Sequence, residues 1–260
     1  MCIRDRGKDR VGTDNHHLFD ILRGTNQRLI SNQTAAENTE SNCLNSFDTN
    51  GFTLGSNTGL NANGEAHVAW NWKANGSGSS NTNGSITSTV SANVDAGFSI
   101  INFQGNQTAG ATVGHGLSKA PEMLIIKNRD TAGYGWLVGH SSRTFEKYSV
   151  LNTTGAEADQ TSIFNDTAPT STVFSLGSDT FGNKTGDDHI CYAFHSVDGY
   201  SKVGSYVGNG NADGTFVYTG FKPMMVISKY IGAENWNIID TKRSTYNAVS
   251  YTHLTLPTKA

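Results

Sequence analysis

The sequence contains few charged residues, few prolines and no long apolar run. Charged residues make up 16% of the 260 residues, four residues are proline, and the formal net charge is −3. Such a chain offers no basic surface for nucleic acid or anionic lipid. No apolar stretch approaches the roughly 20 residues that a membrane-spanning helix needs. We therefore expect neither nucleic acid nor a membrane as a partner.

Cysteines and recognisable catalytic motifs are also scarce. The three cysteines, Cys2, Cys43 and Cys191, show no CxxC or Cys/His spacing, so neither a disulfide framework nor a zinc site is expected. The sequence contains no GxSxG motif, no phosphate-binding loop and no HExxH motif. We predict a non-enzymatic protein with no catalytic residue, no metal and no cofactor.

The apolar residues that are present form short runs. MLIIK, VFSL, ICYAF and GFSIINF are β-branched or aromatic and are bounded by Gly, Asn, Asp and Ser. They predict an all-β fold, either a β-sandwich or a jelly roll. The alternation in ICYAF is typical of a half-buried sheet. We expect a single core that receives the inward-directed side chains Phe98, Ile125, Phe174, Tyr192 and Phe194.

Two sets of motifs recur along the chain. GFSIINFQGN, HGLSKAPEMLIIK and Trp136 are followed later by GYSKVGSYVGNG, YTGFKPMMVISK and Trp236. A second match relates LNTTGAEA, VFSLGS and HICYAF to the earlier ISNQTAAEN, GFTLGS and HVAWNW. One unit of about a hundred residues accounts for both matches, which predicts tandem repeats with one complete copy between two partial ones.

These matches define the predicted parts of the chain. Copy 1 (14–73) holds the later part of a unit, copy 2 (96–197) is a complete β-sandwich repeat, and copy 3 (198–249) holds the earlier part. Residues 74–95 have the composition of a Gly/Ser/Asn-rich linker followed by a first strand. We expect an unstructured or artefactual start at 1–13, an artefactual tail at 250–260, and pairing of copies 1 and 3 into a second sandwich.

Several of these motifs resemble a known family. FDILRGTNQRLISNQTAAE, DTNGFTLGSN, HVAWNWKA and GHGLSKAPEMLIIKNRD are similar to a tandem repeat domain of uncharacterised function found in marine bacteriophage genomes, over about 14–249. The ends, MCIRDR and SYTHLTLPT, resemble adapter-derived sequence in environmental gene models. The resemblance implies a concanavalin-like fold in a tail-fibre-like or other virion structural protein.

The resemblance also implies a place and partners. It implies location in a virion tail, contact with other virion proteins, and carbohydrate binding to a host-surface polysaccharide or glycan. Two alternatives stay open, because a fold does not define a function. One is a phage-tail polysaccharide depolymerase, and the other is an extracellular or cell-surface adhesin repeat of a bacterium. No heptad pattern indicates an oligomeric state.

The candidate ligand-binding residues are aromatic or cationic and recur in the matched motifs: Trp136, Trp236, Arg143 and Arg243. An indole face suits a sugar ring, and a guanidinium group can hold a carboxylate. The alternatives, which we favour, are core packing for the two tryptophans and the ordering of a loop for the arginines. Trp70 and Trp72 alternate within a predicted strand, which favours core packing. The recurring Glu37 and Glu157 lack the second carboxylate of a glycosidase. The cluster Asp187–His189 is interpreted as solvated turn residues rather than as a metal site.

Overall fold

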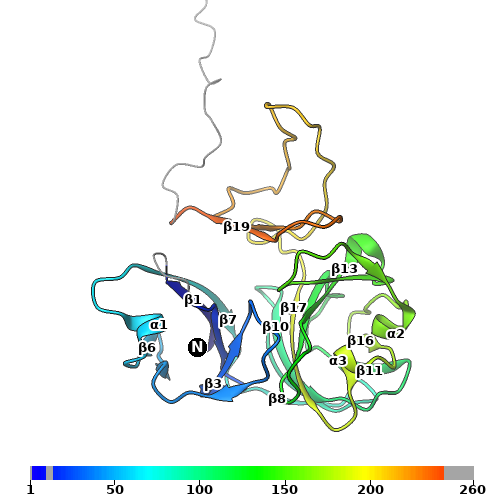
Figure 1. Ribbon diagram of the computed structural model, residues 1–260. Helices are drawn as coiled ribbons and strands as arrows, with labels where there is room; N and C mark the ends of the chain where they lie inside the picture. The colour runs from blue at the N-terminus through cyan, green and yellow to red at the C-terminus, as the bar shows by residue number, and fades with distance from the viewer. Residues whose placement is uncertain (1, 10–13, 243–260) are drawn as a thin grey trace, which may run out of the picture.

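The structure is a computed structural model that describes the backbone of residues 2–9 and the full residues 14–242. It is an all-β protein dominated by a large antiparallel sheet, consistent with a β-sandwich (Figure 1). Among the described residues this sheet has eight strands in the order β15-β14-β13-β12-β17-β10-β9-β8. The strands are β8 (Ser79–Asn81), β9 (Ser88–Asn93), β10 (Phe98–Gln104), β12 (Met123–Asn128), β13 (Trp136–His140), β14 (Lys147–Val150), β15 (Ala158–Asp159) and β17 (Asp188–Phe194).

A second layer covers one face of the eight-stranded sheet. It consists of the two-stranded sheet β11–β16 and the short helices α2 and α3 (Figure 1). Their bounds are β11 (Ala111–Gly114), β16 (Val173–Leu176), α2 (Thr161–Phe164) and α3 (Thr180–Asn183). The short helix η1 (Ser141–Arg143), which has no buried residue, follows β13. The core between the layers contains Ile101, Phe103, Leu124, Ile126, Phe164, Phe174, Cys191 and Ala193.

The opposite face of the same sheet is also buried. It packs against side chains from the first part of the chain, in a core that contains Leu18, Leu29, Ala74, Phe98, Ile100, Ile125, Trp136, Val138, Ile190 and Tyr192. The prediction of a half-buried sheet with one core is therefore wrong. Phe174 lies in the core between the layers, whereas Phe98, Ile125, Tyr192 and the partly buried Phe194 lie on the other face. Strand alternation correctly placed Tyr192 and Phe194 on the opposite face from Cys191 and Ala193, but it did not separate Phe174 from the other four residues or reveal that both faces are covered.

The first part of the chain forms a five-stranded sheet in the order β4-β3-β2-β1-β7. The start of the chain, predicted to be unstructured or artefactual, forms strand β1 between β2 and β7, while residues 1 and 10–13 lie outside the described residues. A small core, with Phe19, Cys43, Leu44 and Leu60, joins the sheet to a hairpin and a short helix. The elements are β1 (Cys2–Asp9), β2 (His17–Asp20), β3 (Gly24–Ile30), β4 (Asn38–Thr39), β5 (Leu44–Phe47), β6 (Phe52–Leu54), α1 (Thr58–Asn61) and β7 (His67–Ala74).

The last described part forms a hairpin of β18 (Met225–Ser228) and β19 (Asn237–Asp240). Figure 1 shows this hairpin, in orange, lying across the ends of both larger sheets. Within the described residues its strands pair only with each other, so copies 1 and 3 share no sheet. Copies 1 and 3 nevertheless touch at the strand around Trp70, where the predicted second sandwich places their contact, because Trp70 Nε1 donates to Asp240. The tail at 250–260 lies outside the described residues. None of the helices described is long and apolar enough to cross a membrane.

The segment predicted as a linker contributes to the large sheet. β8 lies within it and forms the outermost strand of the sheet beside β9. Ala74 at its beginning is buried, whereas most of the other residues up to 85 are exposed or half-exposed. The Gly, Ser and Asn content therefore marks an edge strand and its turns, because an edge strand needs few apolar side chains.

A buried glycine fixes the turn after β16. A Cβ atom at Gly177 would lie 2.0 Å from the Ser162 carbonyl oxygen, and the Gly177 amide donates to the Ile163 carbonyl at 2.8 Å. We expect Gly177→Ala to lower the free energy of unfolding by about 1–3 kcal/mol, because backbone atoms must shift. Urea unfolding measures this loss. Gly155→Ala, at an exposed glycine where an added Cβ would meet only the Thr153 hydroxyl at 3.5 Å, is the matched control. Equal losses in the two variants would contradict the expected clash.

Candidate functional site: contacts between the predicted copies and an open groove

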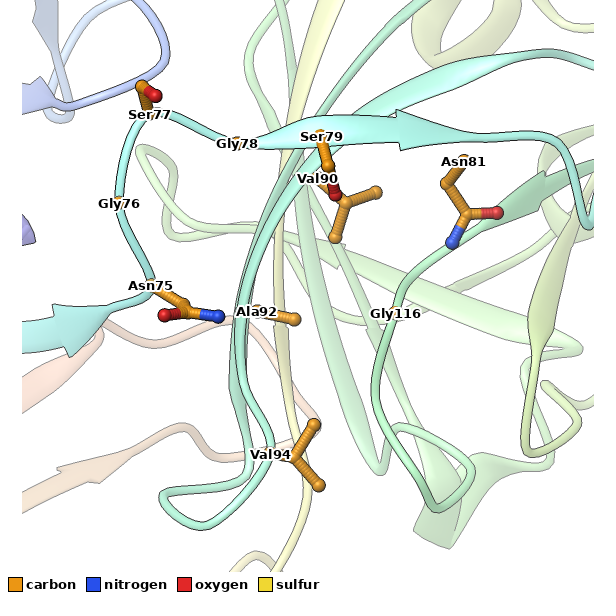
Figure 2. Close-up of a pocket in the computed structure, with 10 residues that line it drawn as sticks. All are labelled: Asn75, Gly76, Ser77, Gly78, Ser79, Asn81, Val90, Ala92, Val94 and Gly116. Carbon is orange, nitrogen blue, oxygen red and sulfur yellow. The ribbon is translucent and has the colours of Figure 1, made fainter.

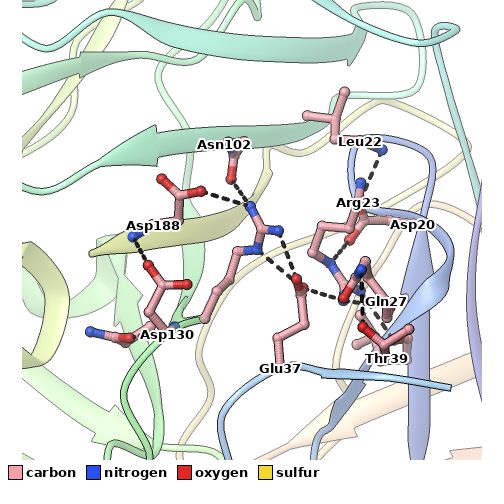
Figure 3. Close-up of polar contacts among 12 residues, drawn as sticks. Asp20, Leu22, Arg23, Gln27, Glu37, Thr39, Asn102, Asp130 and Asp188 are labelled. Carbon is pink, nitrogen blue, oxygen red and sulfur yellow. Dashed lines mark hydrogen bonds and ion pairs between the residues drawn. The ribbon is translucent and has the colours of Figure 1, made fainter. Parts of the chain in front are cut away.

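A buried ion-pair network joins copies 1 and 2. Arg23 Nε lies 2.6 Å from Asp20 Oδ2, and both side chains are fully buried. Arg23 Nη1 also pairs with Glu37 at 3.0 Å, and Arg129 Nη2 of copy 2 reaches the other Glu37 oxygen at 2.7 Å. Figure 3 shows Glu37 beside Arg23 in this network. The network ties the loop after β3 to the turn after β12.

The charges of this network compensate one another. Burial acts to raise the pKa of Asp20, but the Arg23 charge and hydrogen bonds from Tyr192 and Arg23 outweigh burial and hold the pKa below its ordinary value. Burial opposes the charge on Arg129, but Glu37 raises its pKa above the ordinary value. Asp20 and Arg129 are thus held in their charged forms. The arrangement joins segments that are distant in the sequence.

Indole side chains make a matching pair of contacts at positions aligned by the sequence. Trp136 Nε1 donates to the Ile30 carbonyl at 3.0 Å, from copy 2 to copy 1. Trp236 Nε1 donates to the Val150 carbonyl at 3.0 Å, from copy 3 to copy 2. Ile30 and Val150 are the last residues of β3 and β14. Both tryptophans therefore contact the preceding copy through the same kind of hydrogen bond.

Backbone contacts of Glu37 and Glu157 form a second matching pair. The Glu37 amide donates to the Arg129 carbonyl at 2.7 Å, and the Glu157 amide donates to the Ile231 carbonyl at 2.9 Å. Each glutamate side chain also pairs with the arginine of its own copy, Arg23 at 3.0 Å or Arg143 at 2.8 Å. The recurring arginine and glutamate thus order a loop that meets the next copy.

A third pair of contacts reaches from β17 and β7 to aspartates at strand ends. The Tyr192 hydroxyl donates to Asp20 Oδ2 at 2.7 Å, and Trp70 Nε1 donates to Asp240 Oδ2 at 3.2 Å. The first joins copy 2 to copy 1, and the second joins copy 1 to copy 3. Because copy 3 also contacts copy 2 through Trp236, the contacts among the three copies close a ring.

Those predicted ligand-binding residues that the structure describes all take part in contacts within the protein. Trp136 is completely buried, and Trp236 packs, partly buried, against the same core. Arg143 donates to the Ser149 hydroxyl at 3.0 Å in addition to its ion pair with Glu157. Arg243 lies outside the described residues. In this arrangement the Trp136 ring faces protein, so it offers no exposed platform for a sugar.

The lysine that ends each recurring strand closes a turn. Lys127 Nζ donates to the Tyr134 carbonyl at 2.8 Å, and Lys229 Nζ donates to the Gly232 and Glu234 carbonyls at 2.8 and 2.7 Å. Burial lowers the pKa of Lys127 to about 8. The spacing of lysine and tryptophan was visible in the sequence, but the role of the lysine in the turn was not.

The Asp187–His189 cluster is divided among three environments. Asp187 accepts hydrogen bonds from Asn128, Thr131 and Lys184, while Asp188 pairs with Arg129 at 3.4 Å. His189 is completely buried, so the interpretation of all three as solvated turn residues is wrong for the imidazole. Among the described residues, no group of His, Cys, Asp and Glu side chains could hold a metal ion.

Burial gives His189 an acid-sensitive contribution to stability. Its ring stacks on Phe103 with centroids 5.3 Å apart, and burial lowers its pKa to about 4. The unfolded chain binds the proton near pH 6.5, so the contribution is complete above that pH and is lost as the pH falls toward 4. We expect the loss at pH 5 to be about 2 kcal/mol relative to pH 7.

Urea unfolding at pH 7 and pH 5 tests this expectation. His189→Gln should show a smaller decrease in unfolding free energy between the two pH values than the wild-type chain. His17, whose pKa burial also lowers to about 4, remains in both proteins and supplies a common background. An unchanged decrease in the His189→Gln variant would contradict the assigned role of His189.

An open polar groove lies beside β8 and β9, the last two strands at one edge of the large sheet. Its volume is about 450 Å³, and Figure 2 shows its amide and hydroxyl side chains around β8 and β9. A Cβ atom at Gly116 would lie 2.7 Å from the Val90 side chain. Glycine at this position therefore allows the backbone to approach Val90 closely in the wall of the groove. The groove is lined by Asn75, Gly76, Ser77, Gly78, Ser79, Asn81, Val90, Ala92, Val94 and Gly116. This groove could not be recognised in the sequence, because its residues have the composition of a linker.

The fold and the contacts define an antiparallel all-β protein whose segments are joined by buried polar contacts. The chain belongs to a domain family of unknown function, DUF7483, which it matches over residues 6–260. No curated protein and no solved structure matches the chain.

Proposed function

We propose that the chain is a non-enzymatic, repeat-containing segment of a phage tail-fibre-like or other virion structural protein. The proposed task is to build a rigid extension, in contact with other virion proteins. The observation that carries this proposal is the matching pair of indole contacts, Trp136 to Ile30 and Trp236 to Val150. Repeated units that meet through the same contacts can extend a structure while each contacts its neighbours.

Rigidity is supported by the way in which the contacts are buried. Arg23, Asp20 and Trp136 are each at least nine-tenths buried, and they lie where copies 1 and 2 meet. A flexible connection between the copies would instead expose these groups to water. A virion tail location follows from the resemblance of the motifs to phage repeats, and extracellular or cell-surface display as a bacterial adhesin repeat is the alternative location.

Particle labelling tests the proposed location. Antibodies against the purified full chain should label the tails of particles released from a host that carries the gene, and mass spectrometry of those purified particles should detect the chain. An antibody preabsorbed with the chain serves as the control. Labelling of the host envelope with none on particles would contradict the virion proposal and favour the adhesin alternative.

The open groove supports a second proposed activity, the binding of a host-surface polysaccharide. Its amides and hydroxyls are groups that hydrogen-bond to sugar hydroxyls, and Asn75 is exposed at its rim. We expect Asn75→Ala to weaken retention on immobilised host capsule or lipopolysaccharide by about tenfold, equivalent to about 1.4 kcal/mol. Asn63→Ala, at another exposed asparagine outside the groove, should leave retention unchanged.

The same material distinguishes binding from depolymerisation. Incubation of host polysaccharide with the full chain should release no new reducing ends if the segment is non-enzymatic. Time-dependent release that follows the amount of chain would contradict the non-enzymatic proposal and favour the depolymerase. Equal retention of wild-type and Asn75→Ala chains would count against the groove without affecting the structural proposal.

A further inference from the structure

Copy 3 exposes apolar side chains whose aligned residues in copy 2 are buried. Tyr200 is 56% exposed, whereas Phe98, which follows the corresponding glycine in copy 2, is 1% exposed. Val203 corresponds in the same alignment to Ile101, which is completely buried. Phe98 and Ile101 belong to β10, but residues 202–210 form no strand. The first residues of copy 3 thus have the side chains of a buried strand, but their only strand-like pairing among the described residues is an isolated bridge between Ser201 and Val197.

Strand β7 has the complementary feature. It stands at the end of the five-stranded sheet, and in the described part of the chain its only ladder is with β1. Its counterpart β17 lies between two strands, β12 and β10. The position beside β7 that corresponds to β10 therefore carries no strand in this sheet. At one end of β7, Asn93 Nδ2 of the same molecule donates to the Lys73 carbonyl at 3.0 Å. A strand edge that carries no second ladder is a template for pairing with another chain.

We propose that residues 200–204 of one molecule pair with the edge of β7 in a second molecule of this chain. The strands would run antiparallel, with Tyr200 opposite Trp72 and Val203 opposite Ala69. This register reproduces the pairs Phe98 with Phe194 and Ile101 with Cys191 in the complete copy. It would place the Tyr200 ring beside Trp72, as the Phe98 and Phe194 rings lie 5.0 Å apart.

A second molecule is the partner because each single chain holds both segments without joining them. The Val203 amide donates to the Ser196 hydroxyl at 3.0 Å, and the Ser201 hydroxyl donates to the His195 carbonyl at 3.4 Å. These two bonds, together with the backbone hydrogen bonds of Tyr200 and Ser201 to Val197, keep residues 200–203 near the end of β17 in the same molecule. Pairing between molecules would exchange them for a ladder of backbone bonds and would bury Tyr200.

The proposed contact joins two different surfaces, so each molecule in an assembly still has a surface for the next one. Each molecule offers one β7 edge and one copy of residues 200–204, so the surfaces that meet are different. Such a head-to-tail contact continues from molecule to molecule unless its rotation closes a ring. The chain would therefore form linear or ring-shaped oligomers in which strand addition rebuilds the pairing of the complete copy.

Cysteine cross-linking between two single variants tests the register. Under mild oxidation, Ala69→Cys mixed with Val203→Cys should give a disulfide-linked dimer that neither variant forms alone. Wild-type chain, with its own three cysteines, measures the background. Glu65→Cys mixed with Val203→Cys is the out-of-register control. A dimer equally abundant in the control, or no dimer above background, would overturn the proposal.

Sedimentation of the full chain over a range of concentrations tests whether molecules associate through the surface that contains Tyr200. The weight-average mass should rise with concentration, and Tyr200→Asp should weaken association by about tenfold or more, since a charge would be buried at the interface. Tyr218→Asp, at a tyrosine that is 78% exposed and outside the proposed strand, is the matched control. A monomer at all concentrations, or equal effects of the two substitutions, would overturn the proposal. A double Ala69→Cys, Val203→Cys chain that cross-links only within itself would also overturn it.

Discussion

Replacing Arg23 with methionine should lower the free energy of unfolding by about 3–5 kcal/mol, because the change leaves a buried charge without its partner. Asp20 would lose its ion pair at 2.6 Å, and the Leu18 and Gln27 carbonyls would lose the guanidinium donors at 3.0 and 2.9 Å. Methionine fills much of the same volume, so the loss reports mainly on charge and hydrogen bonding. Urea unfolding at neutral pH measures the change.

The matched control for this prediction is Arg28→Met. Arg28 also forms an ion pair, but its side chain remains 16% exposed and its distance to Glu40 is 3.8 Å. We expect that change to cost less than Arg23→Met, because both side chains of the pair reach solvent and the distance between them is longer. Adding Asp20→Asn to Arg23→Met should recover part of the loss, because the remaining buried charge is removed. Similar losses for the two arginine variants, without recovery in the double variant, would contradict the proposed charge compensation.

Trp136→Ala should have a comparable effect, about 3–5 kcal/mol, because a completely buried ring would leave a cavity between copies 1 and 2. Trp136→Phe keeps most of the ring but removes the donor to the Ile30 carbonyl. Loss of this hydrogen bond should lower the free energy of unfolding by about 0.5–1.5 kcal/mol. Thermal and urea unfolding of both variants would separate packing from hydrogen bonding.

Two other aromatic residues, Trp236 and Tyr230, serve as comparisons for the stability loss expected in Trp136→Ala. Trp236 is only partly buried, so Trp236→Ala should cost less than Trp136→Ala. Tyr230 is 64% exposed, and Tyr230→Ala should change stability by less than about 0.5 kcal/mol. A Trp136→Ala loss no larger than that of Tyr230→Ala would show that the contact between copies 1 and 2 does not contribute to folding.

Much of the local structure could be predicted from the sequence because it depends on neighbouring residues. The alternation in ICYAF correctly predicted that Tyr192 and Cys191 point to opposite faces of their strand. The short β-branched and aromatic runs predicted the all-β class. The recurrence of Lys127 with Trp136, and of Lys229 with Trp236, identified segments that make the same turn and the same indole contact.

The tertiary structure decided what each face and each end contacts. Strand alternation cannot tell whether water or a second sheet covers a face, so the sequence did not show that the first part of the chain would cover the face that carries Trp136. Nor could the sequence show that Arg129 would share Glu37 with Arg23, because that contact joins segments far apart in the chain. The groove around Asn75 likewise depends on β8 being an edge strand rather than a linker. The sequence by itself determined the strands and their two faces through local geometry, whereas long-range packing alone decided which groups were buried together.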